Sequence, residues 1–212
     1  MFPRIASLVI GYVFGIFQTA YFYGRMKGID IREHGSGNAG TTNALRVLGK
    51  KAGIIVFAGD FLKCFFAINL VRVLFKNTAP EILQLIALYS ATGCILGHNF
   101  PVQLNFRGGK GIACTAGLLA AMDVRIGVIA LLTFFVIVAI TRYVSLGSII
   151  IVTEFAIFLM IFGQKGFYGM AQPALLEMYA LGVFLAVMAI WRHRANIVRL
   201  LNGTENKIFS KK

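Results

Sequence analysis

Three short polar segments contain most of the residues that can bind an anion or move a proton. The first lies between residues 35 and 46 and combines glycines with hydroxyl, amide and guanidinium side chains. Its members are Gly35, Ser36, Gly37, Asn38, Gly40, Thr41, Thr42, Asn43 and Arg46. Glycines let backbone N–H groups surround an anion, hydroxyls and amides add donors, and arginine offers a planar fork for phosphate or carboxylate. This composition is typical of a phosphate-binding loop.

Two common phosphate-binding motifs do not fit this first segment. Gly35, Gly37 and Gly40 have the spacing of a dinucleotide-binding fingerprint, but that motif follows a strand, whereas here a long apolar stretch comes before it. A P-loop requires lysine after its last glycine, where this chain has Thr41. A flexible linker remains the alternative, since clusters of Gly, Ser and Asn often form only turns.

The second segment lies between residues 97 and 111. Its last part, Arg107-Gly108-Gly109-Lys110, directly precedes an apolar stretch. Free N–H groups at the start of a helix, together with the helix dipole and two cations, favour an anion there. His98 ends the preceding apolar stretch, where an imidazole can bind an anion, stabilise the helix C-terminus or act as a base. The sequence leaves these three roles open.

The third segment begins at Arg192 and ends at Glu205. Helical spacing predicts that residues 192, 196 and 199 share one face. The arginines alone are typical of a basic juxtamembrane helix that binds lipid headgroups. Lipid binding does not explain His193, Asn196 and Glu205, and these side chains indicate a polar site.

The remainder of the chain predicts helices that cross a membrane. Of its 212 residues, 58% are hydrophobic and 14% are charged, compared with roughly 45–50% and 25% in soluble domains. A bilayer core about 30 Å thick requires about 20 apolar helical residues per crossing. Low-charge stretches occupy residues 5–23, 52–75, 81–97, 111–122, 126–140, 144–163 and 173–191. We therefore expect an all-α integral membrane protein with a single domain, residues 1–212. This domain is a bundle of seven transmembrane helices. The stretch at 111–122 is short for a full span.

The net charge of +13 is distributed unevenly over the two predicted membrane sides. With seven spans, segments 24–51, 98–110 and 141–143 and the tail from 192 share one side. This side holds fifteen of the 21 Lys and Arg residues, including Lys211 and Lys212. The positive-inside rule then places the N-terminus outside and the C-terminus in the cytoplasm. Because the basic residues flank apolar spans, we expect contacts with membrane lipids and no nucleic-acid binding.

Charged residues inside the predicted spans are rare, because burying them in lipid is costly. Asp60 and Lys63 are one helical turn apart, so we expect a local ion pair with a structural role. Glu154 has no partner that sequence spacing indicates. The three cysteines stand alone in apolar stretches, without the spacing of a disulfide framework or a zinc site. We predict no metal and no cofactor.

Taken together, these segments resemble the bacterial acyl-phosphate:glycerol-3-phosphate acyltransferases, the PlsY family. The resemblance covers nearly the whole chain and rests on the order and spacing of its motifs. They are Ile29-Asp30-Ile31-Arg32, residues 35–46, Asp60-x-x-Lys63, residues 97–111 and residues 193–205. It implies a seven-helix enzyme of the bacterial cytoplasmic (inner) membrane that transfers a fatty acyl group from acyl phosphate to the 1-hydroxyl of glycerol 3-phosphate. The expected products are lysophosphatidic acid and phosphate, in the first acylation step of phospholipid synthesis.

The resemblance also implies roles for individual residues. It places the active site at the cytoplasmic face, gives catalytic roles to Ser36, His98, His193 and Asn196, and makes Glu205 a structural anchor. The substrate phosphates are expected to bind the other residues of the first segment and Arg107, Gly108, Gly109 and Lys110. Two points stay open: which segment binds which phosphate, and whether a histidine or the substrate's own phosphate takes the hydroxyl proton. A functional link to an enzyme that produces acyl phosphate is also implied.

Two positions depart from the family pattern. Gly15-Ile16-Phe17-Gln18 stands where the family usually has Gly-Ser-Ile/Phe-Pro, and Arg107 stands where lysine is usual. We expect these changes to alter a helix kink and the substrate preference more than the type of reaction.

Two other classes of membrane protein are alternatives: a different glycerolipid acyltransferase and a transporter. The other large class of glycerolipid acyltransferases requires His followed five residues later by Asp, but positions 39, 103 and 198 are Ala39, Gln103 and Val198. A transporter for an organic phosphate or another anion remains the alternative function. Polar clusters on one predicted side, rather than at the midplane of the membrane, favour an interfacial enzyme.

Overall fold

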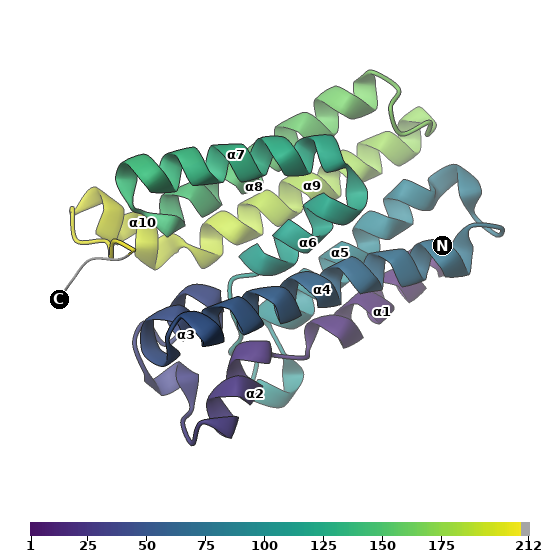
Figure 1. The fold of residues 1–212 in the computed structure, drawn as a ribbon. Coiled ribbons are helices and arrows are strands. Elements are labelled where there is room, and N and C mark those ends of the chain that lie inside the picture. The colour runs from purple at the N-terminus through teal and green to yellow at the C-terminus, as the bar shows by residue number, and fades with distance from the viewer. Residues whose placement is uncertain (209–212) are drawn as a thin grey trace. The chain divides into compact units, whose positions relative to one another are not determined.

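A computed structural model describes residues 1–208, and Lys211 and Lys212 lie outside this range (Figure 1). The described residues form ten α-helices and three short 3₁₀ helices, and they contain no strand. The predicted all-α class is therefore confirmed. The chain divides into two compact units, unit 1 from Met1 to Met122 and unit 2 from Asp123 to Lys212.

Three long helices form the framework of unit 1. They are α1 (Phe2–Gly15), α4 (Lys50–Phe75) and α5 (Leu83–Asn99), which pack side by side in Figure 1. Glycines let α1 and α5 approach closely: a Cβ on Gly11 would overlap the Ser90 carbonyl, and a Cβ on Gly93 would overlap the Leu8 carbonyl. Small residues at helix contacts are a common solution in membranes, where close van der Waals packing drives association.

The first predicted span is interrupted. Residues 5–23 were expected to form one helix, but α1 ends at Gly15 and α2 (Thr19–Met26) begins after a break at residues 16–18. The break includes Gln18, where the resemblance leads us to expect proline, so the helix is interrupted without a proline.

Side chains from elsewhere in unit 1 hold this break. An interrupted helix leaves carbonyl oxygens without their helical partners, and in apolar surroundings other protein groups must replace water as donors. Lys63 Nζ donates to the carbonyls of Gly15 and Phe17 at 3.2 and 2.6 Å. Gln103 Nε2 donates to the carbonyl of Ile16. All three carbonyls at the break therefore have a donor.

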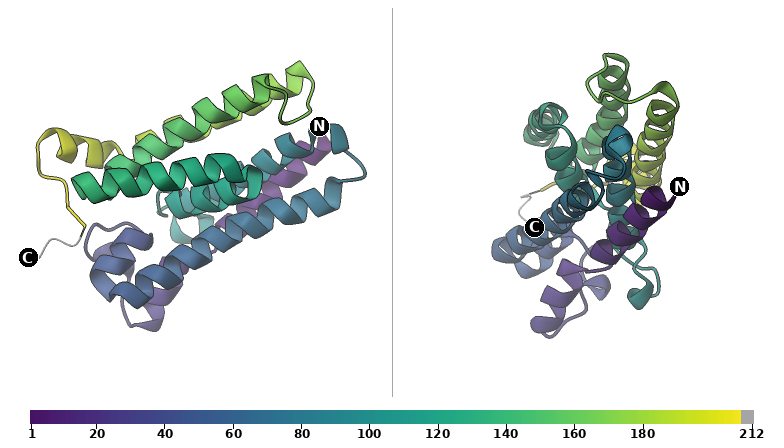
Figure 2. Two further views of the ribbon diagram at one scale, coloured as in Figure 1. Left: turned by 45° about the horizontal axis from the view of Figure 1, so that its top comes forward. Right: turned by 90° about the vertical axis from the view of Figure 1, so that its right-hand side faces the viewer.

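The first polar segment, residues 35–46, lies in the stretch between α2 and α4. This stretch contains the 3₁₀ helix η1 (Ile31–Glu33) and the eight-residue helix α3 (Thr41–Leu48), which packs against α4. Figure 2 shows α2 and α3 gathered at the end of unit 1 away from the N-terminus. The short helix thus gives the polar loop before it a fixed support.

The predicted span at 111–122 is a short helix, α6 (Ile112–Met122), of 11 residues. Its C-terminal end is covered by Arg72 of α4, whose guanidinium donates to the Ala121 carbonyl and, at 2.7 Å, to Gln84 Oε1. A helix that ends among apolar residues needs such a donor, because its last carbonyls have no helical partners. Before α6, residues 100–111 form a loop that contains the 3₁₀ helix η3 (Val102–Leu104).

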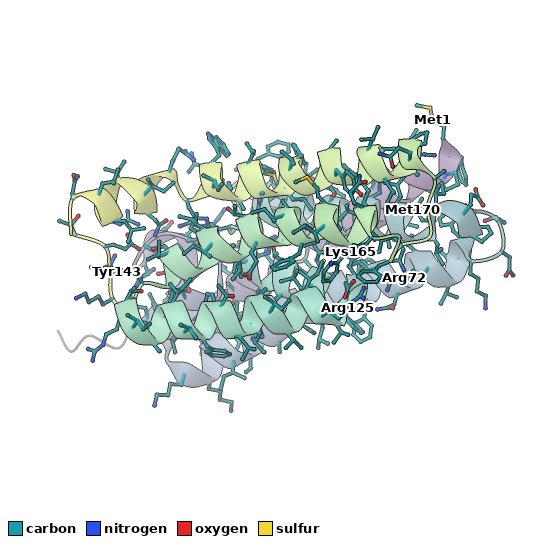
Figure 3. The ribbon with its side chains drawn as sticks, turned by 90° about the horizontal axis from the view of Figure 1, so that it is seen from above. Met1, Arg72, Arg125, Tyr143, Lys165 and Met170 are labelled. Atoms are coloured by element: carbon teal, nitrogen blue, oxygen red, sulfur yellow. The ribbon has the colours of Figure 1, made fainter. Side chains whose placement is uncertain are left out.

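Unit 2 consists of three long helices and one short one. They are α7 (Val124–Thr141), α8 (Val144–Gln164), α9 (Gln172–Arg192) and α10 (Arg194–Leu201). α8 packs against both α7 and α9. Figure 3 shows Tyr143 at one end of this unit and Arg125 and Lys165 at the other. Within the helices, Thr133 of α7 donates to Glu154 Oε1 of α8 at 3.0 Å, which gives Glu154 the partner that sequence spacing did not indicate.

One helix prediction in unit 2 is wrong. Residues 192, 196 and 199 were expected to share one helical face, but α9 ends at Arg192 and α10 begins at Arg194. The residue between them, His193, has a non-helical backbone conformation, with φ of −95° and ψ of 6°. Only Asn196 and Arg199 therefore lie on one short helix.

Six helical segments in the described residues are long and apolar enough to cross a membrane. They are Phe2–Met26, Lys50–Phe75, Pro80–Leu104, Val124–Thr141, Val144–Gln164 and Gln172–Arg192. They correspond to six of the seven predicted spans, and α6 is the shorter apolar helix that corresponds to the seventh. The chain is therefore a helical membrane protein with several spans.

Candidate active site

The loop before α3 is folded around the side chain of Asn43. The Asn43 amide donates to the carbonyls of Ile31 and His34 at 3.1 and 2.9 Å, and its Oδ1 accepts the Ser36 N–H at 2.8 Å. Asn43 is 1% exposed. Both of its N–H donors are used inside the loop, so Asn43 holds the loop in shape rather than pointing a donor outward.

Gly35 cannot be replaced by a larger residue in this loop. Its φ is +62°, a region that side chains disfavour, and a Cβ there would overlap Asn43 Oδ1 and lie 2.8 Å from Val47 Cγ2. The glycine therefore allows the loop to close on Asn43.

Several donors of the first segment remain on the outside of this loop. Ser36 and Arg46 are exposed, and Gly40 precedes the first turn of α3, whose N–H groups have no helical partners. Thr41 Oγ1 is buried without a hydrogen-bond partner among the described residues. These groups form an arrangement that can receive an anion through backbone, hydroxyl and guanidinium donors.

Asp30 and Arg32, which precede the first segment, form an ion pair that is connected to the second segment. Arg32 makes an ion pair with Asp30, with Nη2 2.7 Å from Oδ2, and its Cζ lies 4.9 Å from the centre of the Tyr21 ring. Hydrogen bonds from the Arg32 side chain hold the pKa of the Asp30 carboxyl below its ordinary value. Arg32 Nη1 also donates to the Leu104 carbonyl at 3.4 Å. This arginine therefore connects the first polar segment to the second.

The second polar segment folds back on the last turn of α5. The Gly108 N–H donates to the Asn99 carbonyl at 3.2 Å, and the Gly109 N–H donates to the His98 carbonyl at 3.1 Å. Asn105 and Phe106, with φ of 52° and 59°, make the reversal that brings the chain back. The turn at residues 107–110 is thus tied to the end of α5, with Arg107 exposed and Lys110 partly buried.

The two glycine-containing segments meet at Gly109. A Cβ on this residue would overlap His98 Nε2 and would lie 2.9 Å from the Ala39 carbonyl oxygen. Only glycine fits at such a close approach. The first segment, the turn at residues 107–110 and the His98 ring are therefore neighbours within unit 1.

His98 is buried beside the predicted ion pair. Lys63 Nζ lies 2.9 Å from Asp60 Oδ1, so the expected pair forms, and it also lies 2.9 Å from His98 Nδ1. His98 Nδ1 is 3.6 Å from Asp60 Oδ1, which further accepts the Thr19 hydroxyl at 3.0 Å. The histidine ring is therefore fixed from its Nδ1 side by α4, while its Nε2 edge faces Gly109.

The third segment forms its own hydrogen-bonded cluster in unit 2. Glu205 accepts from Asn196 Nδ2 at 2.8 Å and from Arg199 Nε at 2.7 Å, and Ser145 donates to the same carboxylate at 3.1 Å. His193 is 3% exposed, and its Nδ1 lies 2.8 Å from the Ala189 carbonyl oxygen. Glu205 thus ties the chain after α10 to the start of α8.

Several residues of this arrangement were not predicted from the sequence. Gln18 and Thr19 lie at the helix break, and Asn99 is fully buried with no partner for either amide atom among the described residues. The sequence named Gln18 only as a departure from the family pattern, and a polar residue in an apolar stretch was the signal for its contact with another helix. Within residues 1–208, no group of three or more His, Cys, Asp or Glu side chains is placed to hold a metal ion.

The fold and this site define a class of protein: a multi-span helical membrane protein in which two polar, glycine-rich loops meet. A family model described as glycerol-3-phosphate acyltransferase matches residues 5–203. The chain is 42% identical to the glycerol-3-phosphate acyltransferase of Clostridioides difficile (strain 630), over 100% of this chain and 98% of the relative. It is 41% identical to that of Halalkalibacterium halodurans, over 97% and 96% of the two chains.

Two crystal structures of PlsY, an integral membrane glycerol 3-phosphate acyltransferase, have the same fold. The glycerol 3-phosphate form superposes with a TM-score of 0.83 at 31% identity, over 97% of this chain and 95% of that one. The lysophosphatidic acid form gives a TM-score of 0.80 at 30% identity, with the same coverage. The chain belongs to the glycerol-3-phosphate acyltransferase family.

Proposed function

We propose that this protein transfers a fatty acyl group from acyl phosphate to the 1-hydroxyl of glycerol 3-phosphate. The hydroxyl oxygen bonds to the acyl carbon, the bond between that carbon and the phosphate oxygen breaks, and the hydroxyl proton is released. The products are lysophosphatidic acid and phosphate. Both substrates carry a phosphate, and acyl phosphate is already activated, so the protein mainly has to position the two molecules and stabilise charge.

The observation that carries this proposal is that the two loops proposed to bind anions meet at Gly109. The Ala39 carbonyl and the His98 ring enclose this glycine, and the Arg32–Leu104 contact joins the same two loops. Two adjacent loops with separate sets of donors suit a reaction between two phosphorylated molecules. The solved PlsY forms named for glycerol 3-phosphate and lysophosphatidic acid support the same reaction.

Each loop contributes different groups to phosphate binding. From the first loop, the donors are the hydroxyls of Ser36, Thr41 and Thr42, the Asn38 amide, the Arg46 guanidinium and the backbone around Gly35, Gly37 and Gly40. From the second loop they are Arg107 and Lys110. The N–H groups of Gly108 and Gly109 were also expected to bind phosphate, but they donate to the carbonyls of Asn99 and His98 and hold the turn in place. Ser36 has no adjacent base that would make it a nucleophile, so it is proposed as a hydrogen-bond donor. Asn43 is proposed to position the first loop.

The two candidate histidines are suited to opposite tasks. The ion-paired Lys63 ammonium only donates, so a neutral His98 ring accepts from it at Nδ1 and carries its proton on Nε2, and a protonated ring carries a proton on Nε2 as well. His193 Nδ1 lies against a carbonyl oxygen, which only accepts, so the neutral His193 ring has its lone pair on Nε2. We propose that His98 donates a hydrogen bond toward developing negative charge and that it does not act as the base.

Two acceptors then fit the hydroxyl proton: His193 Nε2 and an oxygen of the acyl phosphate. His193 and Asn196 are proposed to take part in the reaction, with Glu205 holding Asn196 in place. If the phosphate takes the proton, the substrate serves as its own base and His193 orients the hydroxyl by a hydrogen bond. The effect of removing His193 separates these two routes.

The membrane arrangement completes the proposal. We propose that the chain acts as one domain in the bacterial cytoplasmic membrane, with α6 as a short seventh membrane segment. The N-terminus lies outside, and the active site and C-terminus lie on the cytoplasmic side, as the distribution of Lys and Arg supports. Acyl phosphate is reactive, so a separate enzyme that produces it must supply the donor.

The test is an assay of the purified protein with acyl phosphate and labelled glycerol 3-phosphate. We expect labelled lysophosphatidic acid from acyl phosphate and none from acyl-CoA or acyl-carrier protein. Product from a thioester alone would contradict the proposed donor. No product from any donor would contradict the acyltransferase activity itself.

A further inference from the structure

The Gln18 side chain lies at the break of the first membrane helix and reaches the last turn of α5. We infer that Gln18 is a positioning residue for the turn at residues 107–110, acting through the His98 carbonyl. The inference rests on the proposed function, since it concerns the placement of a phosphate-binding turn.

Gln18 is fully buried, and its amide nitrogen is surrounded by acceptors. Nε2 donates to the carbonyls of Gly15, Gly97 and His98 at 3.2, 3.4 and 3.1 Å. Because carbonyl oxygens only accept, the NH₂ group must face them. The amide therefore bridges the end of α1 and the end of α5.

The hydrogen bonds of Gln18 matter more for the end of α5 than for the helix break at residues 16–18. The Gly15 carbonyl also accepts from Lys63, and the carbonyls of Ile16 and Phe17 accept from Gln103 and Lys63. The break therefore keeps donors without Gln18. Gln18 adds a donor for the Gly97 carbonyl and a second donor for the His98 carbonyl. Its amide is fully buried, and in apolar surroundings other protein groups must replace water as donors.

The His98 carbonyl is the link between Gln18 and the proposed site. It accepts Gln18 Nε2 and the Gly109 N–H, each at 3.1 Å. Lys110 follows Gly109 directly in the chain. A shift of this carbonyl therefore moves the turn that carries Lys110, and displacements of about 1 Å in a catalytic site can cost about a hundredfold in rate.

The test compares Gln18→Met, which keeps the length of the side chain and removes its donors, with wild type. We expect the KM for at least one of the two phosphorylated substrates to rise about tenfold. We also expect faster hydrogen exchange of the Gly109 amide in the purified, detergent-solubilised protein. If Gln18→Met does not fold, Gln18→Asn keeps an amide but withdraws it by one methylene, and it gives the same comparison.

Thr92→Val is the matched control. Thr92 is a buried residue of α5 whose hydroxyl donates at 2.8 Å to the Leu88 carbonyl of its own helix, away from the break. The Thr92→Val variant should lose about as much stability as Gln18→Met. Both of its KM values and the hydrogen exchange of its Gly109 amide should stay at wild-type levels. Unchanged KM values and unchanged exchange in the Gln18 variant would overturn the inference. Absence of product from wild type would instead contradict the proposed function, and the exchange measurement would still decide the role of Gln18.

Discussion

At the scale of single residues, the groups proposed to bind phosphate differ in how tightly the protein holds them. Asn43 is locked by three hydrogen bonds inside its loop, whereas the Arg46 side chain is exposed on α3. An exposed arginine next to a rigid loop can close on a ligand without disturbing the fold. Changes at Arg46 should therefore affect binding more than stability.

Arg46→Ala should weaken the binding of a phosphorylated ligand by about 1.5–3 kcal/mol, the usual size of a hydrogen bond to a charged group. This corresponds to more than a tenfold rise in Kd for glycerol 3-phosphate or inorganic phosphate, measured by titration calorimetry. Arg25→Ala removes the same charge from an exposed position at the end of α2 and serves as the control. Equal affinities in wild type and Arg46→Ala would remove Arg46 from the site.

The opposite hydrogen-bonding of the two histidines leads to a second residue-scale prediction. If His193 is the base, His193→Ala should lower kcat by about a hundredfold or more, because general bases contribute about that much. If the substrate's phosphate takes the proton, the loss should be smaller and should appear partly in KM for glycerol 3-phosphate. Steady-state kinetics with both substrates measures the difference. Undiminished turnover in both His193→Ala and His98→Ala would exclude a histidine base.

At the scale of the elements, the site depends on loops that are braced by side chains from neighbouring helices. Arg32 reaches from η1 to the Leu104 carbonyl of η3, and Lys63 reaches from α4 to the break before α2. Each brace is a buried or partly buried polar contact that an apolar environment makes hard to replace. Loss of one brace should therefore loosen a defined segment.

The Asp30–Arg32 brace should be sensitive to acid. The Arg32 side chain lowers the pKa of Asp30 in the folded protein. A carboxylate of this kind adds stability above its unfolded pKa of about 4, and this stability is lost as the pH falls through the lower folded value. Below about pH 4, the Tm of wild type should thus fall toward that of Asp30→Asn, which should be the less stable protein at pH 7.

Thermal unfolding in detergent between pH 7 and pH 3 measures this difference. The control is Glu33→Gln, which changes an exposed carboxylate in η1, the short helix that contains Arg32. The Tm of this variant should depend on pH in the same way as the Tm of wild type. A constant difference in Tm between wild type and Asp30→Asn over the whole pH range would contradict the assigned role of the pair.

Some features of the helices and loops were predicted from the sequence, and others were not. The apolar stretches predict seven spans, and six of them correspond to helices long enough to cross a membrane, because length and the absence of charge are local properties. The break at residues 16–18 was not predicted, because its carbonyls accept from Lys63 and Gln103, which are distant in the chain. The interruption between α9 and α10 at His193 was not predicted either, and its hydrogen bonds are local, to the carbonyls of Ala189 and Ile190. The same holds for the site: the composition of the first segment predicts an anion-binding loop, but the role of Asn43 depends on carbonyls at Ile31 and His34.

At the scale of the whole molecule, an apolar framework is combined with a net charge of +13. Fifteen of the 21 Lys and Arg residues lie on one predicted side of the membrane. In this arrangement the same basic residues set the orientation in the membrane and provide cations for substrates and lipid headgroups. Orientation is therefore a testable consequence of the charge distribution.

The topology can be probed with a membrane-impermeant maleimide, because Cys64, Cys94 and Cys114 are all buried. We expect Lys165→Cys to react in intact cells and Lys27→Cys to react only after the membrane is permeabilised. Both lysines are exposed, so accessibility of the side chain is not limiting. The reverse pattern of labelling would invert the proposed orientation and move the site to the outer face.

The central claim is acyl transfer from acyl phosphate to glycerol 3-phosphate, and the fate of one oxygen atom tests it most directly. The purified protein is given acyl phosphate that carries oxygen-18 between the acyl carbon and phosphorus. Attack of the 1-hydroxyl on the acyl carbon predicts lysophosphatidic acid and labelled phosphate in equal amounts. Absence of lysophosphatidic acid, or label retained in the fatty acid instead of the phosphate, would contradict the account.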